Sequence, residues 1–324
     1  MASIRDVAKL AKVAPSTVSL VLNNKGYVSE TSRKKVLAAI KELNYVPNEL
    51  ARNLFRNCTN IIGVVVPDIA HPFFGTFIRF LEIALYKEGY KILVCSTIER
   101  KNGEHEFVDM LKRQMIDGII MGCHSLEVDL YKNVNKPIVA LDRMINDKIP
   151  IVRSDHKLGG HLAAQKFLAM GCKNPLQVIG SQKVTTPAHI HHLEFEAEMQ
   201  KHGIKIACYE MEWNNFDMNY FKKVATEVLD KYPKVDSIYG ADMLACAFLG
   251  EAHRRGLKIP QDLKIIAHDG TYITDCSMYK ITSIVQPIAL LAQTATKMII
   301  KLIKDENVEK EIILPVSLHE GETC

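Results

Sequence analysis

From residue 61 onward, short apolar runs alternate with stretches of helical spacing, and this alternation constrains the fold more than any other feature of the chain. The strand-like runs are 61–66, 91–95, 118–121, 137–141, 176–179, 237–239 and 263–267. Helical stretches separate them, for example 74–88 and 105–115. Such alternation predicts doubly wound parallel sheets, whose ligands bind beyond the carboxyl ends of the strands.

The first 46 residues have a different pattern, that of three short amphipathic helices. Ser3 and Asp6 resemble a capping box at the start of the first helix. Pro15 suits the first position of the second helix, where a backbone N–H would have no intrahelical partner. Ser29 can cap the third helix. The inward stripe of that helix is expected to be Val36, Leu37, Ile40 and Leu43.

Charge is unevenly distributed along the chain, whose formal net charge is +4. Residues 1–60 contain ten Lys and Arg against four acidic residues, whereas the remainder contains 31 against 33. A basic head on a near-neutral body is typical of a module that binds phosphates. The second helix also exposes small hydroxyl and amide side chains that can contact phosphates and base edges. A helix-turn-helix domain that binds DNA is therefore favoured over a three-helix domain without a partner.

Several motifs together resemble the lactose/galactose repressor family of transcriptional regulators. The motifs in the head are 4–11, 17–19, 21–23 and 28–30, followed by Pro-Asn-x-x-Ala-Arg-x-Leu over 47–54. The resemblance continues at 62–64 and 72–74 and covers essentially the whole chain. The middle of the chain looks most like the sucrose-operon repressor subgroup, at 117–120, 141–143 and 269–272.

The resemblance implies a chain of three parts. Residues 1–46 would form the helix-turn-helix domain, residues 47–60 a hinge helix and linker, and residues 61–324 a body of the periplasmic-binding-protein type that binds an effector and dimerises. One parallel-sheet subdomain would comprise about 61–155 and 287–314, and the other about 156–286 and 315–324. The protein would be a cytoplasmic homodimer that binds double-stranded operator DNA, associates with the nucleoid when bound, and represses a carbohydrate-utilisation operon.

In this family, two hinge helices of a dimer lie in the minor groove, and a leucine at the position of Leu54 pries apart a base step. Unstacking a step costs roughly a few kcal/mol, which contacts to the bent DNA offset. Ala51 would be small so that the paired helices can approach. An ordinary linker helix is the alternative for this segment. The predicted DNA-binding residues are Ser3, Pro15, Ser16, Thr17, Ser19, Leu20, Asn23, Tyr27, Ser29, Thr31, Asn48, Ala51, Arg52 and Leu54.

The second helix departs from the family pattern at Leu20, where the family usually has an Arg that reads a guanine edge. Loss of that bidentate donor removes roughly 1–3 kcal/mol of base discrimination, although leucine can touch a thymine methyl. Ala14 stands where the family has a Ser cap, and Lys12 where it has Gly. We therefore expect an operator that differs from the usual family half-site at the position that the Arg would read.

The resemblance also implies a small effector, a sugar or sugar phosphate, between the two subdomains. Phe73 and Phe74 would form an apolar wall, and Trp213 would stack on the apolar face of a sugar. Carboxylates at strand ends would accept protons from its hydroxyls. Core packing is the alternative for Trp213, and a cap or turn role is the alternative for Asp142 or Asp269. The predicted effector-binding residues are His71, Phe73, Phe74, Asp142, His191, Trp213, Asp242, Asp269 and Gln286.

Histidines and an alanine replace family residues in the expected cleft. His191 stands in place of an Arg that clasps the ligand, His268 in place of a Tyr, and Ala241 in place of an Asn or Asp. An imidazole cannot match the five donors of a guanidinium, so the ligand is expected to be held differently than in the lactose and sucrose regulators. A cleft rich in histidine could respond to pH. It could also bind a metal, as the spacing of His189, His191 and His192 suggests. No metal site and no cofactor are expected, however, because acidic or Cys partners at ligand spacing are absent.

Other classes of protein fit the sequence less well. Control mainly by a protein corepressor, or by a ligand other than a sugar, stays open. A secreted sugar receptor is disfavoured by the basic head and the lack of an apolar signal core. The apolar runs are too short to span a bilayer, and the eight scattered cysteines form no Cys-x-x-Cys pair. An enzyme is disfavoured because phosphate-loop, nucleophile-elbow and metal-ligand motifs are missing.

Overall fold

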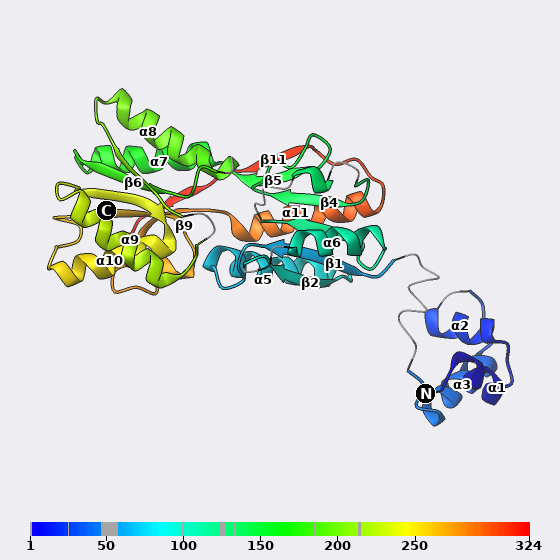
Figure 1. Cartoon of the computed structure of the whole chain (residues 1–324). Coiled ribbons are helices and arrows are strands. Elements are labelled where there is room, and N and C mark those ends of the chain that lie inside the picture. Colours follow the sequence, from blue (N-terminus) through cyan, green and yellow to red (C-terminus); the bar gives the residue numbers. More distant parts are fainter. Residues whose placement is uncertain are drawn as a thin grey trace. The chain divides into compact units, whose positions relative to one another are not determined.

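The computed structural model describes residues 2–24, 26–46, 58–98, 100, 102–123, 128–131, 134–183, 186–212 and 215–324. The chain forms two compact units, Met1–Thr59 and Asn60–Cys324 (Figure 1). Neither unit, in the part that is described, has a helix long and apolar enough to cross a membrane. The hinge helix expected within 47–54 lies outside the described residues.

The head consists of α1 (Ile4–Ala11), α2 (Pro15–Asn23) and α3 (Glu30–Glu42). The capping box of α1 is present, since the Asp6 N–H donates to Ser3 Oγ (3.3 Å) and the Ser3 N–H donates to Asp6 Oδ2 (2.8 Å). Val7, Val18 and Val36, one from each helix, are fully buried and hold the three helices together. The expectation for Leu37 was wrong: its side chain is 53% exposed, because Val36 and Ala39 are the buried residues of α3.

The first sheet of the body has six parallel strands in the order β11-β5-β4-β3-β1-β2. The strands are β1 (Ile61–Val66), β2 (Lys91–Ser96), β3 (Gly118–Met121), β4 (Ile138–Leu141), β5 (Ile151–Ser154) and β11 (Glu311–Leu314). Helices α5 (Pro72–Lys87) and α11 (Ile288–Ile303) cover one face. Helix α6 (Gly103–Lys112) covers the other, and the short 3₁₀ helix η1 (Val128–Tyr131) lies beside it.

The second sheet has the order β12-β10-β9-β8-β6-β7 and is parallel except for β12, which pairs antiparallel with β10. The strands are β6 (Pro175–Ile179), β7 (Ala207–Glu210), β8 (Ser237–Ala241), β9 (Lys264–Asp269), β10 (Thr282–Val285) and β12 (Ser317–His319). Helices α7 (His156–Ala169) and α8 (Ile190–Lys201) cover one face, and α9 (Met218–Lys231) and α10 (Asp242–Arg255) the other (Figure 1). The 3₁₀ helices η2 (Pro187–His189) and η3 (Tyr272–Thr274) complete this half.

The chain passes between the two sheets three times: from β5 to α7, from β10 to α11, and from β11 to β12. The body is therefore two doubly wound α/β subdomains, each built from segments distant in sequence. This architecture places ligands beyond the carboxyl ends of the strands.

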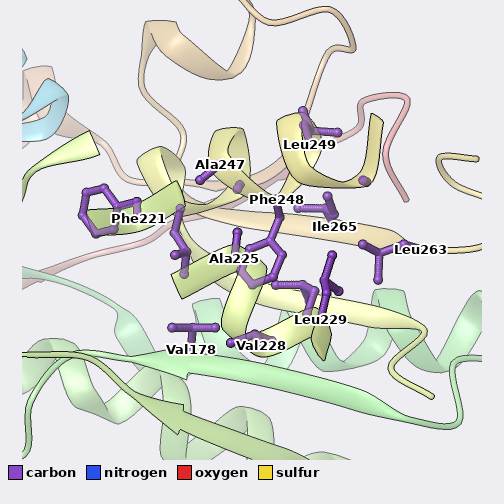
Figure 2. Packing of buried hydrophobic residues seen from close by; sticks show 14 of the residues in the cluster. Val178, Phe221, Ala225, Val228, Leu229, Ala247, Phe248, Leu249, Leu263 and Ile265 are labelled. Atoms are coloured by element: carbon purple, nitrogen blue, oxygen red, sulfur yellow. The ribbon is translucent and has the colours of Figure 1, made fainter. Parts of the chain in front are cut away.

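Apolar packing fixes α9 and α10 against the second sheet. Phe248 of α10 and Val228 of α9 are fully buried and meet Ile265 of β9, with Phe221 at one end of the cluster (Figure 2). Burying a side chain of this size contributes roughly 1.5–3 kcal/mol. The cluster therefore holds α9 and α10 in place against the second sheet.

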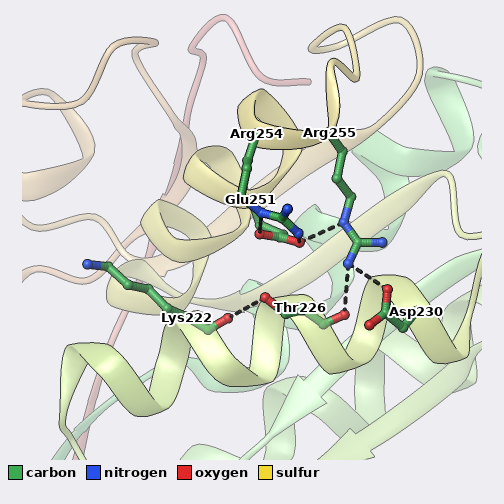
Figure 3. Close-up of polar contacts among 6 residues, drawn as sticks. All are labelled: Lys222, Thr226, Asp230, Glu251, Arg254 and Arg255. Atoms are coloured by element: carbon green, nitrogen blue, oxygen red, sulfur yellow. Dashed lines mark hydrogen bonds and ion pairs between the residues drawn. The ribbon is translucent and has the colours of Figure 1, made fainter.

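Polar contacts tie the same two helices together at their surface (Figure 3). Arg255 of α10 donates to Asp230 Oδ1 (2.7 Å) and to the Thr226 carbonyl oxygen (3.1 Å), both on α9. The Arg255 and Arg254 guanidinium groups also donate to Glu251. These donors lower the pKa of Glu251 to about 2, with Arg254 the larger cause.

Candidate functional site

A cavity of about 260 Å³ lies where the carboxyl ends of strands from both sheets face each other. Residues that follow β1, β3 and β4 line one side, and residues that end or follow β6, β8, β9 and β10 line the other. Seven of the nine residues predicted for an effector line it, namely His71, Phe73, Phe74, Asp142, His191, Asp269 and Gln286. Asp242 does not line it, and Trp213 lies outside the described residues.

One side of the cavity is aromatic. Phe73 and Phe74 belong to the first turn of α5, with ring centroids 5.2 Å apart and planes at 85°. His71, directly before α5, contacts Phe216 of the other subdomain edge to face at 5.2 Å. Burial lowers the pKa of His71 to about 4, so its ring is neutral near pH 7. A small ring with an apolar face fits such a wall.

Two aspartates at strand ends form a polar region of the cavity. Asp142 follows β4 with φ 49°, and Asp269 ends β9 with φ 128°. Residues other than glycine rarely adopt positive φ, and such conformations concentrate at functional sites. Asp142 Oδ1 lies 2.6 Å from His156 Nε2, whereas Asp269 Oδ1 accepts from Gln286 Nε2 at 2.7 Å. Both carboxyl groups are therefore held by one partner each.

The surroundings of the Asp269 carboxyl group disfavour its ionised form. Burial raises its pKa well above the ordinary value, and the nearby carboxylates of Asp242 and Asp142 add to the shift. Gln286, which bonds to it, also accepts from Ser154 Oγ at 2.7 Å. Ser154 and Gln286 precede two of the three chain crossings, so this network connects the cavity to the links between the subdomains.

Asp242 has a supporting position behind the cavity. It is the first residue of α10 and is buried, and its carboxylate accepts from the Thr271 N–H and Thr271 Oγ1 (both 2.6 Å) and from the Gly270 N–H (3.1 Å). Burial raises its pKa to about 6. These bonds fix the loop after Asp269, so the geometry gives Asp242 an indirect role, and direct contact with an effector stays a prediction.

Four histidines are packed together beside the aspartates. The His191 and His268 rings stack with centroids 3.8 Å apart at 10°, His192 lies 3.9 Å from His191, and His156 lies 5.8 Å from His268. Burial lowers the pKa of His191 and His268 well below the ordinary value and that of His192 to about 3. Charged imidazoles this close would also repel one another, so these three rings are neutral.

The backbone of α7 and α8 places this histidine cluster. A Cβ on Gly160 of α7 would collide with the carbonyl oxygen of His191 in α8, so only glycine permits this approach. His268 Nδ1 lies 2.8 Å from Tyr239 Oη, and His192 Nδ1 lies 3.1 Å from Gln177 Oε1. His156 and His192 were not predicted for the site. His156 follows β5, a strand whose short mixed sequence gives little signal.

Three of the histidines that line the cavity have a ring nitrogen without a partner among the described residues. His156 Nδ1, His191 Nδ1 and His268 Nε2 are buried and make no hydrogen bond within the described part of the chain. The described residues that line the cavity also include no Lys or Arg.

Among the described residues, one group brings three possible metal ligands within 4.8 Å, namely His161, Glu194 and Glu198. It lies on α7 and α8 and is not part of the cavity lining. Glu198 already accepts from Lys201 Nζ (2.7 Å) and Gln165 Nε2 (2.8 Å). The contacts describe an ion-pair cluster, and the expectation that the protein needs no metal stays a prediction.

In the head, α2 exposes Ser16 and Leu20, whereas Asn23 is half-buried and Val18 and Val21 are the buried residues of the helix. Leu20 is 37% exposed, and the Asn23 side chain donates to the Ser19 carbonyl oxygen at 2.9 Å.

The other predicted DNA-binding residues are placed as follows. Ser3 and Ser29 accept backbone N–H groups at the starts of α1 and α3. The exposed residues are Pro15, Tyr27 and Thr31, and Thr17 is half-buried. The predicted residues outside the described part of the chain are Asn48, Ala51, Arg52 and Leu54.

Known proteins resemble both units of the chain. Residues 3–48 match the family model of bacterial regulatory proteins, lacI family, and residues 59–322 match that of periplasmic binding proteins and the sugar-binding domain of the LacI family. A sucrose operon repressor of Streptococcus mutans is 36% identical over 324 residues, covering 100% of this chain and 99% of that protein. A ribose operon repressor of Halalkalibacterium halodurans is 36% identical over 305 residues, covering 94% and 91%. The lac repressor dimer bound to operator and an anti-inducer has the same fold, with a TM-score of 0.88 at 24% identity over 99% of this chain and 98% of that one.

Proposed function

This chain belongs to the lacI family of bacterial regulatory proteins, and on that premise we propose that it represses a carbohydrate-utilisation operon. A homodimer binds double-stranded operator DNA through its helix-turn-helix heads. A small effector binds in the cavity between the two subdomains of each body. The nine effector residues and fourteen DNA-binding residues predicted above are the proposed contacts.

The observation that carries this proposal is the composition of the cavity wall. Residues from both subdomains line it, so a ligand there has a different affinity for different arrangements of the two halves. The two subdomains are linked by three crossings, and we propose that their arrangement controls the affinity of the heads for the operator. Effector and operator affinities would then be coupled reciprocally.

The remaining assignments follow from family membership. We place the protein in the cytoplasm, at the nucleoid when it is bound to DNA. We propose that the ligand is bound and released unchanged, since the family is one of regulatory proteins. We propose the domain boundaries 1–46, 47–60 and 61–324, and a compact unit that begins at Asn60 supports a separate body.

Operator binding with and without sugars tests the proposal. Full-length protein would select its operator from a pool of random DNA duplexes, and fluorescence anisotropy would measure the affinity with sucrose, fructose, ribose and other sugars. A sugar that changes operator affinity supports the proposal. Failure to select any specific duplex would refute repression of an operon. Specific DNA binding that no sugar changes would instead favour control by a protein corepressor.

A further inference from the structure

We propose that the ligand of the cavity is an uncharged polyhydroxylated molecule, and that the imidazoles of His191 and His268 bind its hydroxyl groups without any cation. This inference rests on the proposed function and narrows its effector class. It selects an unphosphorylated sugar over a sugar phosphate or a sugar acid. The charges, the ring nitrogens and the aromatic wall each support it.

The charge of the cavity opposes an anion. The described lining residues include no Lys or Arg, whereas Asp142, Asp269 and Glu212 place three carboxyl groups there. A phosphate needs charge-assisted donors, for which proteins use Arg, Lys or a cluster of backbone N–H groups. Here a phosphate would find no Lys or Arg among the described lining residues to compensate its charge.

The same groups do not favour a cationic ligand. Asp142 is already bonded to His156 Nε2 at 2.6 Å. Asp269 is buried, which raises the pKa of its carboxyl group, and it accepts from Gln286. Each aspartate is therefore already engaged by a described partner, and an uncharged ligand is the best match.

The ring nitrogens match the chemistry of a hydroxyl group. A neutral imidazole has one N–H donor and one acceptor nitrogen, and a hydroxyl can likewise donate and accept. His156 Nδ1, His191 Nδ1 and His268 Nε2 belong to cavity-lining residues that are more than nine-tenths buried, and they have no partner within the described residues. Buried polar atoms are seldom left unpaired, so these three nitrogens mark positions for ligand hydroxyls.

The aromatic wall completes the fit. Phe73, Phe74 and Phe216 line the cavity together with the neutral ring of His71. Sugars present C–H groups on one face and hydroxyls around the rim, and this cavity offers an apolar wall and a polar region of donors and acceptors.

Matched pairs of ligands test the inference on the full-length protein. Each pair is a sugar and its phosphate ester: ribose and ribose 5-phosphate, fructose and fructose 6-phosphate, sucrose and sucrose 6-phosphate. Isothermal titration at fixed ionic strength would measure both affinities, with glucosamine as a cationic probe and glucose as its neutral partner. We expect at least one free sugar to bind, with its ester at least about 100-fold weaker. An ester or a cationic sugar that binds as tightly as its neutral partner would overturn the inference.

Two variants at one position separate charge from hydrogen bonding. His191→Arg supplies a cation and should reduce the ratio of sugar affinity to ester affinity by about tenfold or more. His191→Phe keeps a ring in the stack, removes both nitrogens, and should weaken sugar binding by about tenfold. The control His202→Arg adds the same charge at an exposed position after α8 and should change neither affinity.

The outcomes distinguish this inference from the function on which it rests. Unchanged sugar affinity in a folded His191→Phe protein would refute the role of the imidazole. Tight binding of an ester alone would refute the uncharged ligand and leave a sugar-type repressor standing. If no member of any pair binds, the proposed effector class fails and this inference fails with it, while operator binding in the same samples still reports on repression.

Discussion

Leu20 places a large apolar side chain on the outward face of α2, between Ser16 and Asn23. An apolar side chain can contact a thymine methyl group but cannot donate to a guanine. A single residue would therefore change which base the head prefers, while the helix that carries it stays the same.

An arginine at position 20 would restore a hydrogen-bond donor for guanine and should change which operator sequence the protein prefers. We expect Leu20→Arg to gain roughly 1–3 kcal/mol, or about 5- to 150-fold, for half-sites with a guanine at that position. Binding selection from random duplexes followed by anisotropy would measure the change. Leu37→Arg is the matched control, because Leu37 is an exposed leucine on α3 and gains the same charge. An identical preferred sequence for the wild type and Leu20→Arg would contradict the prediction.

His192 should make stability depend on pH. The unfolded side chain has a pKa near 6.5, whereas burial, with nearby His189 and His156, lowers the pKa in the folded state to about 3. Between these values only the unfolded state takes up the proton, so stability falls as pH falls from about 6.5. The loss from one such group is up to about 1.4 kcal/mol per pH unit.

A neutral substitution isolates this contribution. We expect the unfolding free energy of wild type, minus that of His192→Gln, to decrease by about 1 kcal/mol or more from pH 6 to pH 5. Urea unfolding at pH 7.5, 6 and 5 would measure it, with His319→Gln as an exposed control. A difference that stays constant over this range would show that His192 titrates normally in the folded protein.

At the scale of elements, α9 and α10 are joined by an apolar cluster and by the carboxylate of Glu251 (Figures 2 and 3). Glu251→Gln removes the charge that two arginines share. The Arg254 side chain is 65% exposed, so water screens its ion pair with Glu251. The expected loss of unfolding free energy at pH 7 is therefore only about 1 kcal/mol.

The pH dependence of this loss has a definite sign. The folded pKa of Glu251, about 2, lies below its ordinary value of 4.5, so the carboxylate stabilises the fold above pH 4.5. That contribution decreases as pH falls from 4.5 toward 2. Chemical unfolding of wild type and Glu251→Gln at pH 7, 5 and 4 would measure it, with Glu309→Gln as the exposed control. If the difference in unfolding free energy between wild type and Glu251→Gln grew as the pH fell, the lowered pKa of Glu251 would be refuted.

The elements also show what a sequence of this kind can predict. The central strands, such as β1 and β3, are apolar runs that are buried on both faces, so their pattern is unambiguous. The edge strand β7 alternates half-buried and exposed residues and was not predicted, because an edge strand carries less apolar signal. Strand β5 was also missed, since its four residues include Arg153 and Ser154.

Prediction from sequence is limited in the same way at the candidate site. Residues that follow predicted strands, such as Phe73 and Asp142, can be assigned to a shared edge of the sheet from the sequence alone. His156 follows the unpredicted β5, and it was missed for that reason. Asp242 has the right residue type at the right strand end, but its carboxylate turns to the backbone of Gly270 and Thr271. Orientation within a loop depends on tertiary hydrogen bonds that periodicity does not encode.

At the scale of the whole molecule, exposed apolar side chains on the first subdomain bear on assembly. Ile83 and Tyr86 on α5 and Leu93 and Val94 on the edge strand β2 are exposed, and Tyr86 is 73% exposed. An edge strand next to an apolar helix face is a surface that proteins normally cover. We infer that the partner subunit of the proposed homodimer covers it.

A charge on this surface should separate the subunits. We expect Tyr86→Glu to sediment as a monomer at concentrations where the wild type is a dimer, because a carboxylate would be buried without a partner. Operator affinity should fall by about 100-fold or more, since two linked heads bind both half-sites with an effective concentration that single heads lack. Leu193→Glu, which adds the same charge at an exposed leucine on α8, is the control and should leave both measurements unchanged. A Tyr86→Glu protein that remains dimeric, with wild-type operator affinity, would show that the dimer uses another surface.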